Sequence, residues 1–367
     1  EIVVTSETAG GPDADIPPEP TEECAALPSP LYLAVLPFEA VDIGESGSEG
    51  TADLALGLAD ALAAALARDE AVHVIPPAAA RGLRADDVRR LARHLGANLL
   101  LRGSVRLSQA EMRISYSLYH PYRGVQLAAR TLAGTRAELF LLEDQLVADV
   151  VHLLGRHADG RQAGIRPRPN PIARERHLQA LGYLLRFDHE ASVDGAIRLL
   201  EDLVATDPDD ASYYATLGRA YLQKYRVTVE GVWENKAAAA CHRALSLAPH
   251  SPDVLISLGE LHLAAGRHRE AIGEFEAVLA DRPDSAAAHR DLSRALDAAG
   301  LRHEAERECR RAIALQPDYW AHYNQLGLIL YHEGRFAAAA EVWRQVTCLS
   351  PDNAMGYSNL AGALFRQ

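Results

Sequence analysis

Residues 252–353 consist of three successive blocks of 34 residues: PDVLISLGELHLAAGRHREAIGEFEAVLADRPDS (252–285), AAAHRDLSRALDAAGLRHEAERECRRAIALQPDY (286–319) and WAHYNQLGLILYHEGRFAAAAEVWRQVTCLSPDN (320–353). Each block repeats a glycine, an alanine and a proline at fixed phases: Gly266, Gly300 and Gly334; Ala271, Ala305 and Ala339; Pro283, Pro317 and Pro351. A fixed period of this size is typical of stacked helical hairpins. Each block therefore predicts a helix, a short turn at the glycine, a second helix and a Pro-Asp turn.

The composition favours a folded chain that does not bind nucleic acid. Of the 367 residues 48% are hydrophobic, and 37 Lys and Arg stand against 50 Asp and Glu, which gives a net charge of −13. Phosphate contacts need a basic surface, so this balance argues against general nucleic-acid binding. No run of about 18 apolar residues occurs, which predicts that the chain has no transmembrane helix.

The cysteines and histidines predict neither a metal site nor a cofactor. The four cysteines are Cys24, Cys241, Cys309 and Cys348, with no CxxC pair and no histidine at zinc spacing. Cys241 and Cys309 occupy the repeat phase of Phe275 and Trp343, so we expect them to be buried structural thiols. His152 and His157 lie five residues apart, a spacing that does not align two ligands on one helical face, and no HExxH motif occurs.

The first part of the chain predicts a linker and then an α/β domain. Residues 1–30 carry prolines among Gly, Ser, Thr and acidic residues, as disordered linkers do. Residues 31–156 alternate short apolar runs with amphipathic segments, which predicts the order β-α-β-α-β-β-β-α and a mixed sheet with helices against one side. The expected strands are 32–38, 71–75, 98–107, 112–119 and 125–132. Residues 157–172 carry Gly and Pro without a core pattern and predict a second linker.

Residues 173–367 predict an all-α superhelix of five repeats plus a truncated sixth. Counting back from Pro283 gives earlier repeats that end at Pro249 and Pro208, and residues 354–367 resemble a first helix without its partner. Pro208 and Pro249 are 41 residues apart instead of 34, which predicts an insertion near 225–233 that projects from the turn. The first helices carry Gly or Ser where we expect the Ala of the second helix to approach closely.

The repeat region resembles the tetratricopeptide family over about half of the chain, because five repeats keep their Gly, Ala and Pro phases in register. Ser293 in place of Gly and the long second turn depart from the family pattern. The resemblance implies a right-handed superhelix whose concave face, built by the first helices, binds a peptide or a helix of a partner protein.

The α/β segment resembles the TolB amino-terminal-like, FlgO-like domain of bacterial multidomain regulators. The resemblance rests on Ala34 to Phe38 (AVLPF), Leu58 to Leu62 (LADAL) and Leu95 to Leu118. Such a domain followed by tetratricopeptide repeats is similar to the carboxy-terminal regulatory half of bacterial serine/threonine protein kinases, and of some adenylyl cyclases and winged-helix regulators. The resemblance implies a segment of a larger signalling protein, whose catalytic domain would lie upstream.

Two motifs suggest catalysis or phosphate binding and are better explained otherwise. His289 to Leu292 spell HRDL, but Leu296 stands where a kinase catalytic loop needs Asn, and no kinase phosphate loop or DFG motif occurs. Gly44, Gly47 and Gly50 form a glycine-rich loop, but the loop lacks a lysine and carries acidic residues that repel phosphate. No GxSxG or Cys-His context occurs either, so no catalytic residue is expected and the segment is predicted not to be an enzyme.

The candidate binding residues follow from the family register, which places fixed positions of each first helix on the concave face. They are Arg219 and Leu222 in repeat two; Ile256, Glu260 and Leu263 in repeat three; Arg290, Arg294 and Asp297 in repeat four; and Asn324, Leu328 and Tyr331 in repeat five. Arg290 and Arg294 lie four residues apart, so both guanidinium groups can reach one carboxylate or phosphate. Salt bridges with the nearby Glu260 and Asp297 are the favoured interpretation of these arginines, and a clamp on the carboxylate of a partner is the alternative.

The favoured function is a non-catalytic module that recruits protein partners through the repeat groove. The alternative is that the α/β domain senses a nucleotide or another small molecule and signals through the repeats. Residues 354–367 are expected to leave an apolar face that drives self-association. A cytoplasmic location is favoured, with the extracytoplasmic face of the inner membrane as the alternative.

Overall fold

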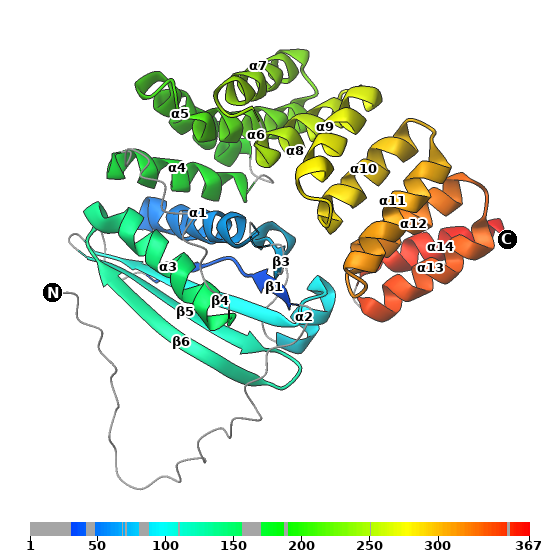
Figure 1. The fold of residues 1–367 in the computed structure, drawn as a ribbon, viewed down its shortest axis with the longest axis horizontal. Helices are drawn as coiled ribbons and strands as arrows, with labels where there is room; N and C mark the ends of the chain where they lie inside the picture. The colour runs from blue at the N-terminus through cyan, green and yellow to red at the C-terminus, as the bar shows by residue number, and fades with distance from the viewer. Residues whose placement is uncertain are drawn as a thin grey trace, which may run out of the picture.

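The computed structural model describes residues 31–41, 48–67, 69, 72–80, 88–108, 111–155, 170–186, 190–249, 251–350 and 353–367. An α/β domain comes first in the chain, and an array of helices follows it (Figure 1). The predicted linker at 1–30, Cys24, Gly44, Gly47 and most of the second linker lie outside the described residues.

The α/β domain contains a mixed sheet, as the sequence predicts. The strand order is β3 (Val72–Ile75), β1 (Leu31–Val35), β4 (Leu99–Leu107), β5 (Met112–His120) and β6 (Val125–Gly134). β1 runs parallel to β3 and β4, whereas β4, β5 and β6 are antiparallel. The predicted strand 32–38 ends at Val35, and the short strand β2 (Glu39–Ala40), which the sequence analysis missed, pairs with β4.

Helices cover both faces of the sheet, which corrects the expectation of helices on one side. α1 (Ser48–Leu66) and α3 (Leu139–Leu153) pack with Leu33, Val35 and Leu101 in the main core. The opposite face, with Ala34, Leu36 and Leu100, packs against η2 (Pro77–Ala80) and α2 (Val88–Leu95). Neighbouring residues of β1 and β4 enter different cores because side chains alternate across a strand. The short helix η3 (Arg136–Glu138) precedes α3.

The remainder of the described chain is helical, with two helices in each repeat and one helix at the end. The helices are α4 (Pro171–Leu184), α5 (Glu190–Thr206), α6 (Ala211–Thr228), α7 (Gly231–Leu247), α8 (Pro252–Ala264), α9 (His268–Asp281), α10 (Ala286–Ala298), α11 (Arg302–Leu315), α12 (Trp320–His332), α13 (Phe336–Leu349) and α14 (Ala354–Arg366). The periodic glycines Gly266, Gly300 and Gly334 have φ of 75°, 81° and 76°. Such a left-handed residue ends a helix at little cost only when it is glycine, which explains its place in every turn.

The glycines of the first helices make room for the residue four positions after the alanine of the second helix, and Gly218 also approaches the alanine itself, with a Cβ that would lie 3.6 Å from Ala237 O. A Cβ on Gly259 would lie 2.8 Å from the Phe275 ring, and one on Gly327 would lie 2.4 Å from Trp343 Nε1. In repeat four Cys309 replaces the aromatic residue, and the first helix carries Ser293, whose hydroxyl donates to Ala305 O at 2.8 Å. Cys241 and Cys309 are buried, as their phase predicts.

The extra residues of repeat two lengthen its helices and do not form a projecting loop. α6 continues to Thr228, and α7 begins at Gly231. Val229 joins them with φ of 57°, an unusual conformation for a β-branched residue. The Trp233 ring lies 5.9 Å from the Tyr221 ring, and Lys236 Nζ lies 4.8 Å from the Trp233 ring.

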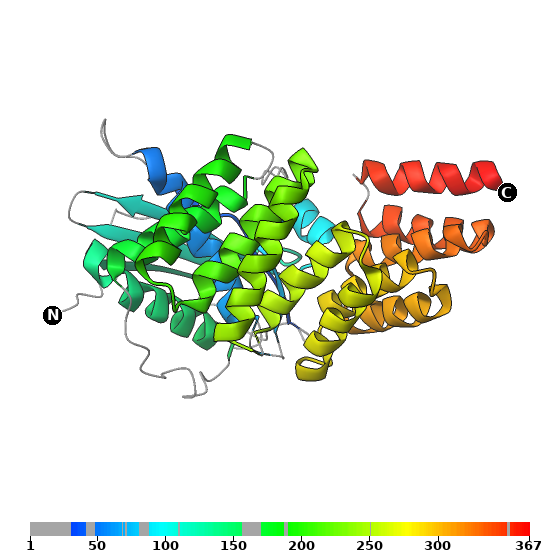
Figure 2. The ribbon, with the colours of Figure 1, turned by 90° about the horizontal axis from the view of Figure 1, so that it is seen from above.

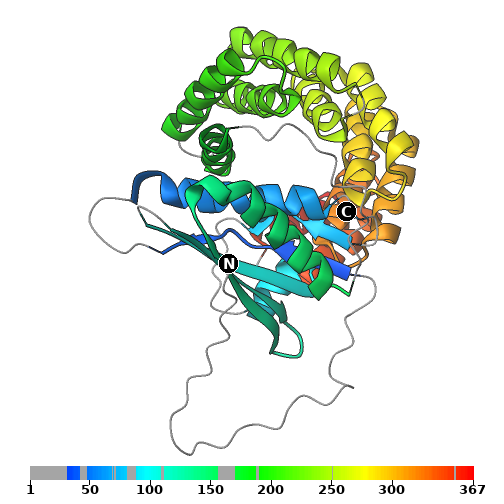
Figure 3. The same cartoon turned by 60° about the vertical axis from the view of Figure 1, so that its left-hand side comes forward.

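The array curves around the α/β domain, with α1 on its inner side (Figures 2 and 3). One contact joins α1 to α4, where a Cβ on Gly57 would lie 1.7 Å from Leu178 O and one on Gly182 would lie 1.9 Å from Asp53 O. A second contact joins β1 and α2 to the later repeats. There Tyr32 Oη donates to Leu315 O at 2.9 Å, and His94 Nδ1 lies 2.7 Å from Ser350 Oγ.

Candidate partner-binding surface

The first helices of the repeats form the inner side of the array. α6 packs on α8, α8 on α10 and α10 on α12, so these four helices form a continuous surface. Figure 3 shows that this side faces the α/β domain. All the predicted binding residues lie on these four helices.

The beginning of this surface is already occupied by the chain itself. Arg219 on α6 forms an ion pair with Asp60 of α1, with Nη1 and Oδ2 3.7 Å apart. Leu222, predicted to lie in the groove, is only 2% exposed and belongs to the core of repeats one to three, which corrects that assignment. Repeat two therefore offers little surface to a partner.

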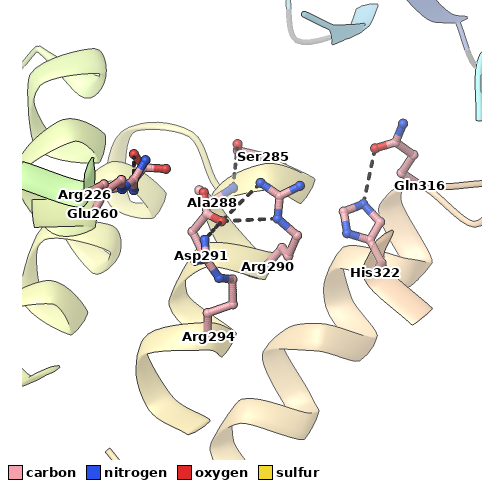
Figure 4. Close-up of polar contacts among 9 residues, drawn as sticks. All are labelled: Arg226, Glu260, Ser285, Ala288, Arg290, Asp291, Arg294, Gln316 and His322. Carbon is pink, nitrogen blue, oxygen red and sulfur yellow. Dashed lines mark hydrogen bonds and ion pairs between the residues drawn. The ribbon is translucent and has the colours of Figure 1, made fainter. Parts of the chain in front are cut away.

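The two arginines of repeat four converge on one carboxylate (Figure 4). Arg290 donates from Nε and Nη2 to Asp291 Oδ1 at 3.2 and 3.1 Å, and Arg294 Nη1 donates to the same oxygen at 3.4 Å. Asp291 raises the pKa of the Arg290 guanidinium above its usual value. The side chains of Arg290 and Arg294 are 27% and 42% exposed, so each retains N–H groups that can face a partner.

The acidic residues expected beside these arginines have other partners. Glu260 accepts from Arg226 Nη2 at 3.3 Å, and Asp297 Oδ2 lies 3.0 Å from His332 Nδ1. The role of Asp291 could not be predicted from the sequence, because neighbouring helix positions are not expected to face each other. Arg226 was missed as well, although it lies on the last turn of α6.

Repeats three and five supply a more apolar part of the surface. Ile256, Leu263, Leu328 and Tyr331 are half-buried, and the last three pack against the core of the later repeats. Asn324 Oδ1 accepts from Asn359 Nδ2 at 2.9 Å, so α14 covers part of this residue. α14 itself exposes Met355, Tyr357, Leu364 and Phe365, the last at 90%.

A buried polar pair, His322 of α12 and Gln316 at the end of α11, lies beside Arg290 (Figure 4). His322 Nε2 lies 3.3 Å from Gln316 Oε1, and the other polar atoms of the pair, His322 Nδ1 and Gln316 Nε2, have no partner in the described residues. Burial, followed by the charge of Arg290, lowers the pKa of His322 to about 3. His322 is therefore neutral at physiological pH and adds no charge to the surface.

The HRDL string forms local contacts within the repeats, and the described residues contain no cluster of metal-ligand type. The HRDL string lies on α10, where His289 Nδ1 is 2.8 Å from Glu308 Oε2 and Asp291 holds the two arginines. No group of three His, Cys, Asp or Glu side chains in the described part of the chain could hold a metal ion. None of the described helices has both the length and the hydropathy of a membrane span.

Comparison with known proteins identifies the repeats. Residues 262–327 and 235–286 match two family models, each described as a tetratricopeptide repeat. A Rhizobium meliloti (strain 1021) protein named as a putative adenylate cyclase is 24% identical over 208 residues, which are 55% of this chain and 34% of that protein. The chain thus spans about a third of that relative's length.

Solved structures resemble about half of the chain. TTC0263, a thermophilic TPR protein of Thermus thermophilus, is 19% identical with a TM-score of 0.44 and covers 52% of this chain and 99% of its own. PilW, a type IV pilus biogenesis factor, is 19% identical with a TM-score of 0.45 and covers 54% of this chain and 91% of its own. The family models together cover residues 235–327, and this part of the helical region consists of tetratricopeptide repeats.

Proposed function

We propose that this chain is a non-catalytic regulatory module that binds an acidic segment of a partner protein on the concave surface of repeats three to five. The observation that carries this proposal is the pair of Arg290 and Arg294 on the single carboxylate of Asp291. Two guanidinium groups on one carboxylate leave a net positive charge and unused donors. A carboxylate of a partner fits this arrangement because arginine binds carboxylates through paired N–H groups.

The apolar residues of α8 and α12, on either side of the two arginines, set the length of the partner segment. Ile256 and Leu263 lie on α8, and Leu328 and Tyr331 lie on α12, so the arginines of α10 stand between two apolar patches. A segment with an acidic centre and apolar flanks complements this order. Repeat two is less suitable because Arg219 already contacts α1 and Leu222 is buried.

Fluorescence anisotropy with labelled decapeptides tests the proposal. Peptides with a Glu centre and Leu flanks should bind the full chain, and their Gln counterparts should bind at least about tenfold more weakly, since hydrogen bonds to charged groups contribute about 1.5–3 kcal/mol. Arg290→Ala with Arg294→Ala should abolish the difference. The control is Arg302→Ala with Arg307→Ala on the outer helix α11, both exposed. Equal affinity of both double variants for the Glu peptide would reject the proposal.

The module belongs, in this proposal, to a larger bacterial signalling protein. The resemblance to kinase-linked regulators and the partial match to a protein named as a putative adenylate cyclase support this assignment. The full gene sequence tests it, since a catalytic kinase or cyclase domain is expected upstream. An upstream region without any catalytic domain would contradict it.

The structure also favours a second candidate function, in which the α/β domain senses a small molecule. The domain contacts the array at α4 and again near Ser350, so a change in the domain has a direct route to the repeats. A nucleotide screen by thermal shift on the full chain tests this idea. A ligand at 100 times its Kd should stabilise the chain by about 2.7 kcal/mol, and no shift with any nucleotide would reject this class.

A further inference from the structure

The arginines of this acidic protein are concentrated in one part of the α/β domain. Residues 88–134 contain eight arginines and a single acidic residue, Glu111, although the whole chain has a net charge of −13. Arg130 lies on the face of the sheet that α3 covers, where its Nη1 is 3.5 Å from Asp149 Oδ1. The other seven lie on α2, on the turn between β5 and β6, and on the opposite face of the sheet.

Three of these arginines form what we call the arginine face. Arg102 and Arg106 alternate with core residues of β4, and Arg113 does so on β5, so all three project from the face opposite α1 and α3. Arg106 pairs directly with Arg113 in the strand register. Like charges opposite each other destabilise a sheet, so this arrangement favours a bound anion.

No helix of the described chain covers the arginine face across β5 and β6 (Figures 1 and 3). The side chains between the arginines are hydroxyls, at Ser104, Ser115, Ser117 and Thr131. Arg102 and Arg106 make no hydrogen bond or ion pair with the described residues, whereas Arg113 Nε pairs with Glu111 at 3.1 Å. Among the described residues Glu39, next to Ser104, is the other acidic residue on this face, so these described side chains leave it with a net positive charge.

The chain carries a segment of complementary charge immediately before β1. Residues 1–30 contain seven acidic residues and no Lys or Arg: Glu1, Glu7, Asp13, Asp15, Glu19, Glu22 and Glu23. β1 lies next to β4, with Leu33 opposite Leu99. Arg102 is thus about 17 Å along the sheet from Leu31, at 3.3 Å per residue. Glu23 lies eight positions before Leu31, a distance in sequence that spans up to about 28 Å, so its carboxylate can reach Arg102.

We propose that the acidic segment 1–30 docks on the arginine face of its own α/β domain. The covalent connection raises the local concentration of the carboxylates near Arg102, Arg106 and Arg113 to the millimolar range. Each pair is exposed and individually weak, so a stronger polyanion would displace the segment. The arginine face is distinct from the concave surface of the repeats, and the two proposals stand independently.

Disulfide trapping in the full chain tests this docking. Cys24 lies within the segment, and Cys348→Ser removes the exposed thiol of α13. Ser117→Cys places a thiol opposite Arg102 in the register of β4 and β5. We expect the disulfide between positions 24 and 117 to form roughly tenfold more slowly with Arg102→Glu and Arg106→Glu, the combined loss of several weak pairs. The rate should also fall at 1 M salt, where the screening length is about 3 Å.

A charge swap separates docking from a general effect of mutation. Adding Glu22→Arg and Glu23→Arg to the Arg102→Glu and Arg106→Glu variant should restore fast trapping. The control pair Arg302→Glu and Arg307→Glu, on the outer helix α11, should leave the rate unchanged. If the rate of disulfide formation changed neither with the charge reversal at Arg102 and Arg106 nor with the charge swap, the proposal would be overturned. So would binding of anionic vesicles or of nucleic acid that depends on Arg102 and Arg106 while the trapping rate does not.

Discussion

The α/β domain touches the repeat array in two regions of different construction. At α1 and α4 the backbones meet at Gly57 and Gly182, and Leu178 and Leu181 of α4 belong to the core of the α/β domain. Near repeats four and five the contact includes Tyr32, His94 and Gly96 against backbone oxygens and Ser350, and the His94 ring lies 5.7 Å from the Trp320 ring. The first region resembles a protein core, whereas the second combines hydrogen bonds with a ring contact. We therefore expect the first repeat to unfold with the α/β domain, whereas the second contact can open separately.

The largest expected effect on stability comes from a substitution in the first region, where α1 meets α4. Gly182→Leu places a side chain where Asp53 O is only 1.9 Å from the new Cβ, and both partners are helix backbones that cannot move aside. We expect a loss of about 3 kcal/mol or more in the free energy of unfolding, at the upper end of overpacking effects. Urea denaturation measures it. Gly273→Ala in α9, with no atom within 4 Å of the new Cβ, should instead stabilise by about 0.5–1 kcal/mol.

The pH dependence of stability sharpens the same comparison, because α4 carries a buried histidine. Arg174 Nη1 lies 3.3 Å from His177 Nδ1, and His177 Nε2 lies 2.8 Å from Thr216 Oγ1, which itself donates to Ser212 O. His177 therefore donates from Nε2 and accepts at Nδ1, as only the neutral ring can. Burial, then the charge of Arg174, lowers its pKa to about 3.

The free energy of unfolding should fall as the pH drops below about 6.5. The unfolded chain binds this proton near pH 6.5 and the folded chain only near pH 3. Between those values each such histidine therefore lowers the free energy of unfolding by about 1.4 kcal/mol for every pH unit that the pH falls. His322, whose pKa is also lowered to about 3, adds a second proton in repeat five. His177→Gln should reduce by one the number of protons that the chain takes up on unfolding, and should lower the slope of the free energy of unfolding against pH accordingly.

The sequence predicted the parts of the fold that depend on local periodicity. The glycines at 266, 300 and 334 end helices, and the alternation in 112–119 marks a strand. The continuous apolar run of β1 also indicated that both faces of the sheet are covered at this strand, since such runs are typical of strands buried on both sides. The α1–α4 contact could not be predicted, because Gly57 and Gly182 recur at no period and meet only in the folded chain.

The binding surface was less predictable than the fold. Leu222 was placed in the groove by a register taken from the 34-residue repeats, but Tyr225 and Trp233 of the lengthened repeat two belong to the same core cluster as Leu222. The pairing of Arg290 with Asp291 depends on side-chain rotamers that no spacing rule supplies. The choice of Arg290 and Arg294 as binding residues stays a prediction.

A smaller effect on stability is expected from a substitution in the second region, where β1 and α2 contact repeats four and five. Gly96 has φ of 63°, and a Cβ there would lie 2.6 Å from Asp318 O. Gly96→Ala should cost about 1–2 kcal/mol for the left-handed backbone and should separate repeat five from α2 without unfolding the chain. Small-angle scattering should show a larger radius of gyration. Gly124→Ala, with φ of 70° and only Arg89 nearby, carries the same backbone cost and should leave the radius unchanged. Equal radii for both variants would contradict a separable contact.

The smallest effect is expected at the ion pair between Arg219 and Asp60, which lies beside the first region without belonging to its core. The two side chains are 3.7 Å apart and 44% and 15% exposed, so solvent screens them. A double-mutant cycle with Arg219→Gln and Asp60→Asn should give a coupling of less than about 1 kcal/mol that declines at high salt. Arg174 and Glu143, joined by two bonds of 2.9 Å and only 23% and 12% exposed, should couple more strongly. The opposite ranking would contradict the expectation that burial and close geometry set the strength of these two ion pairs.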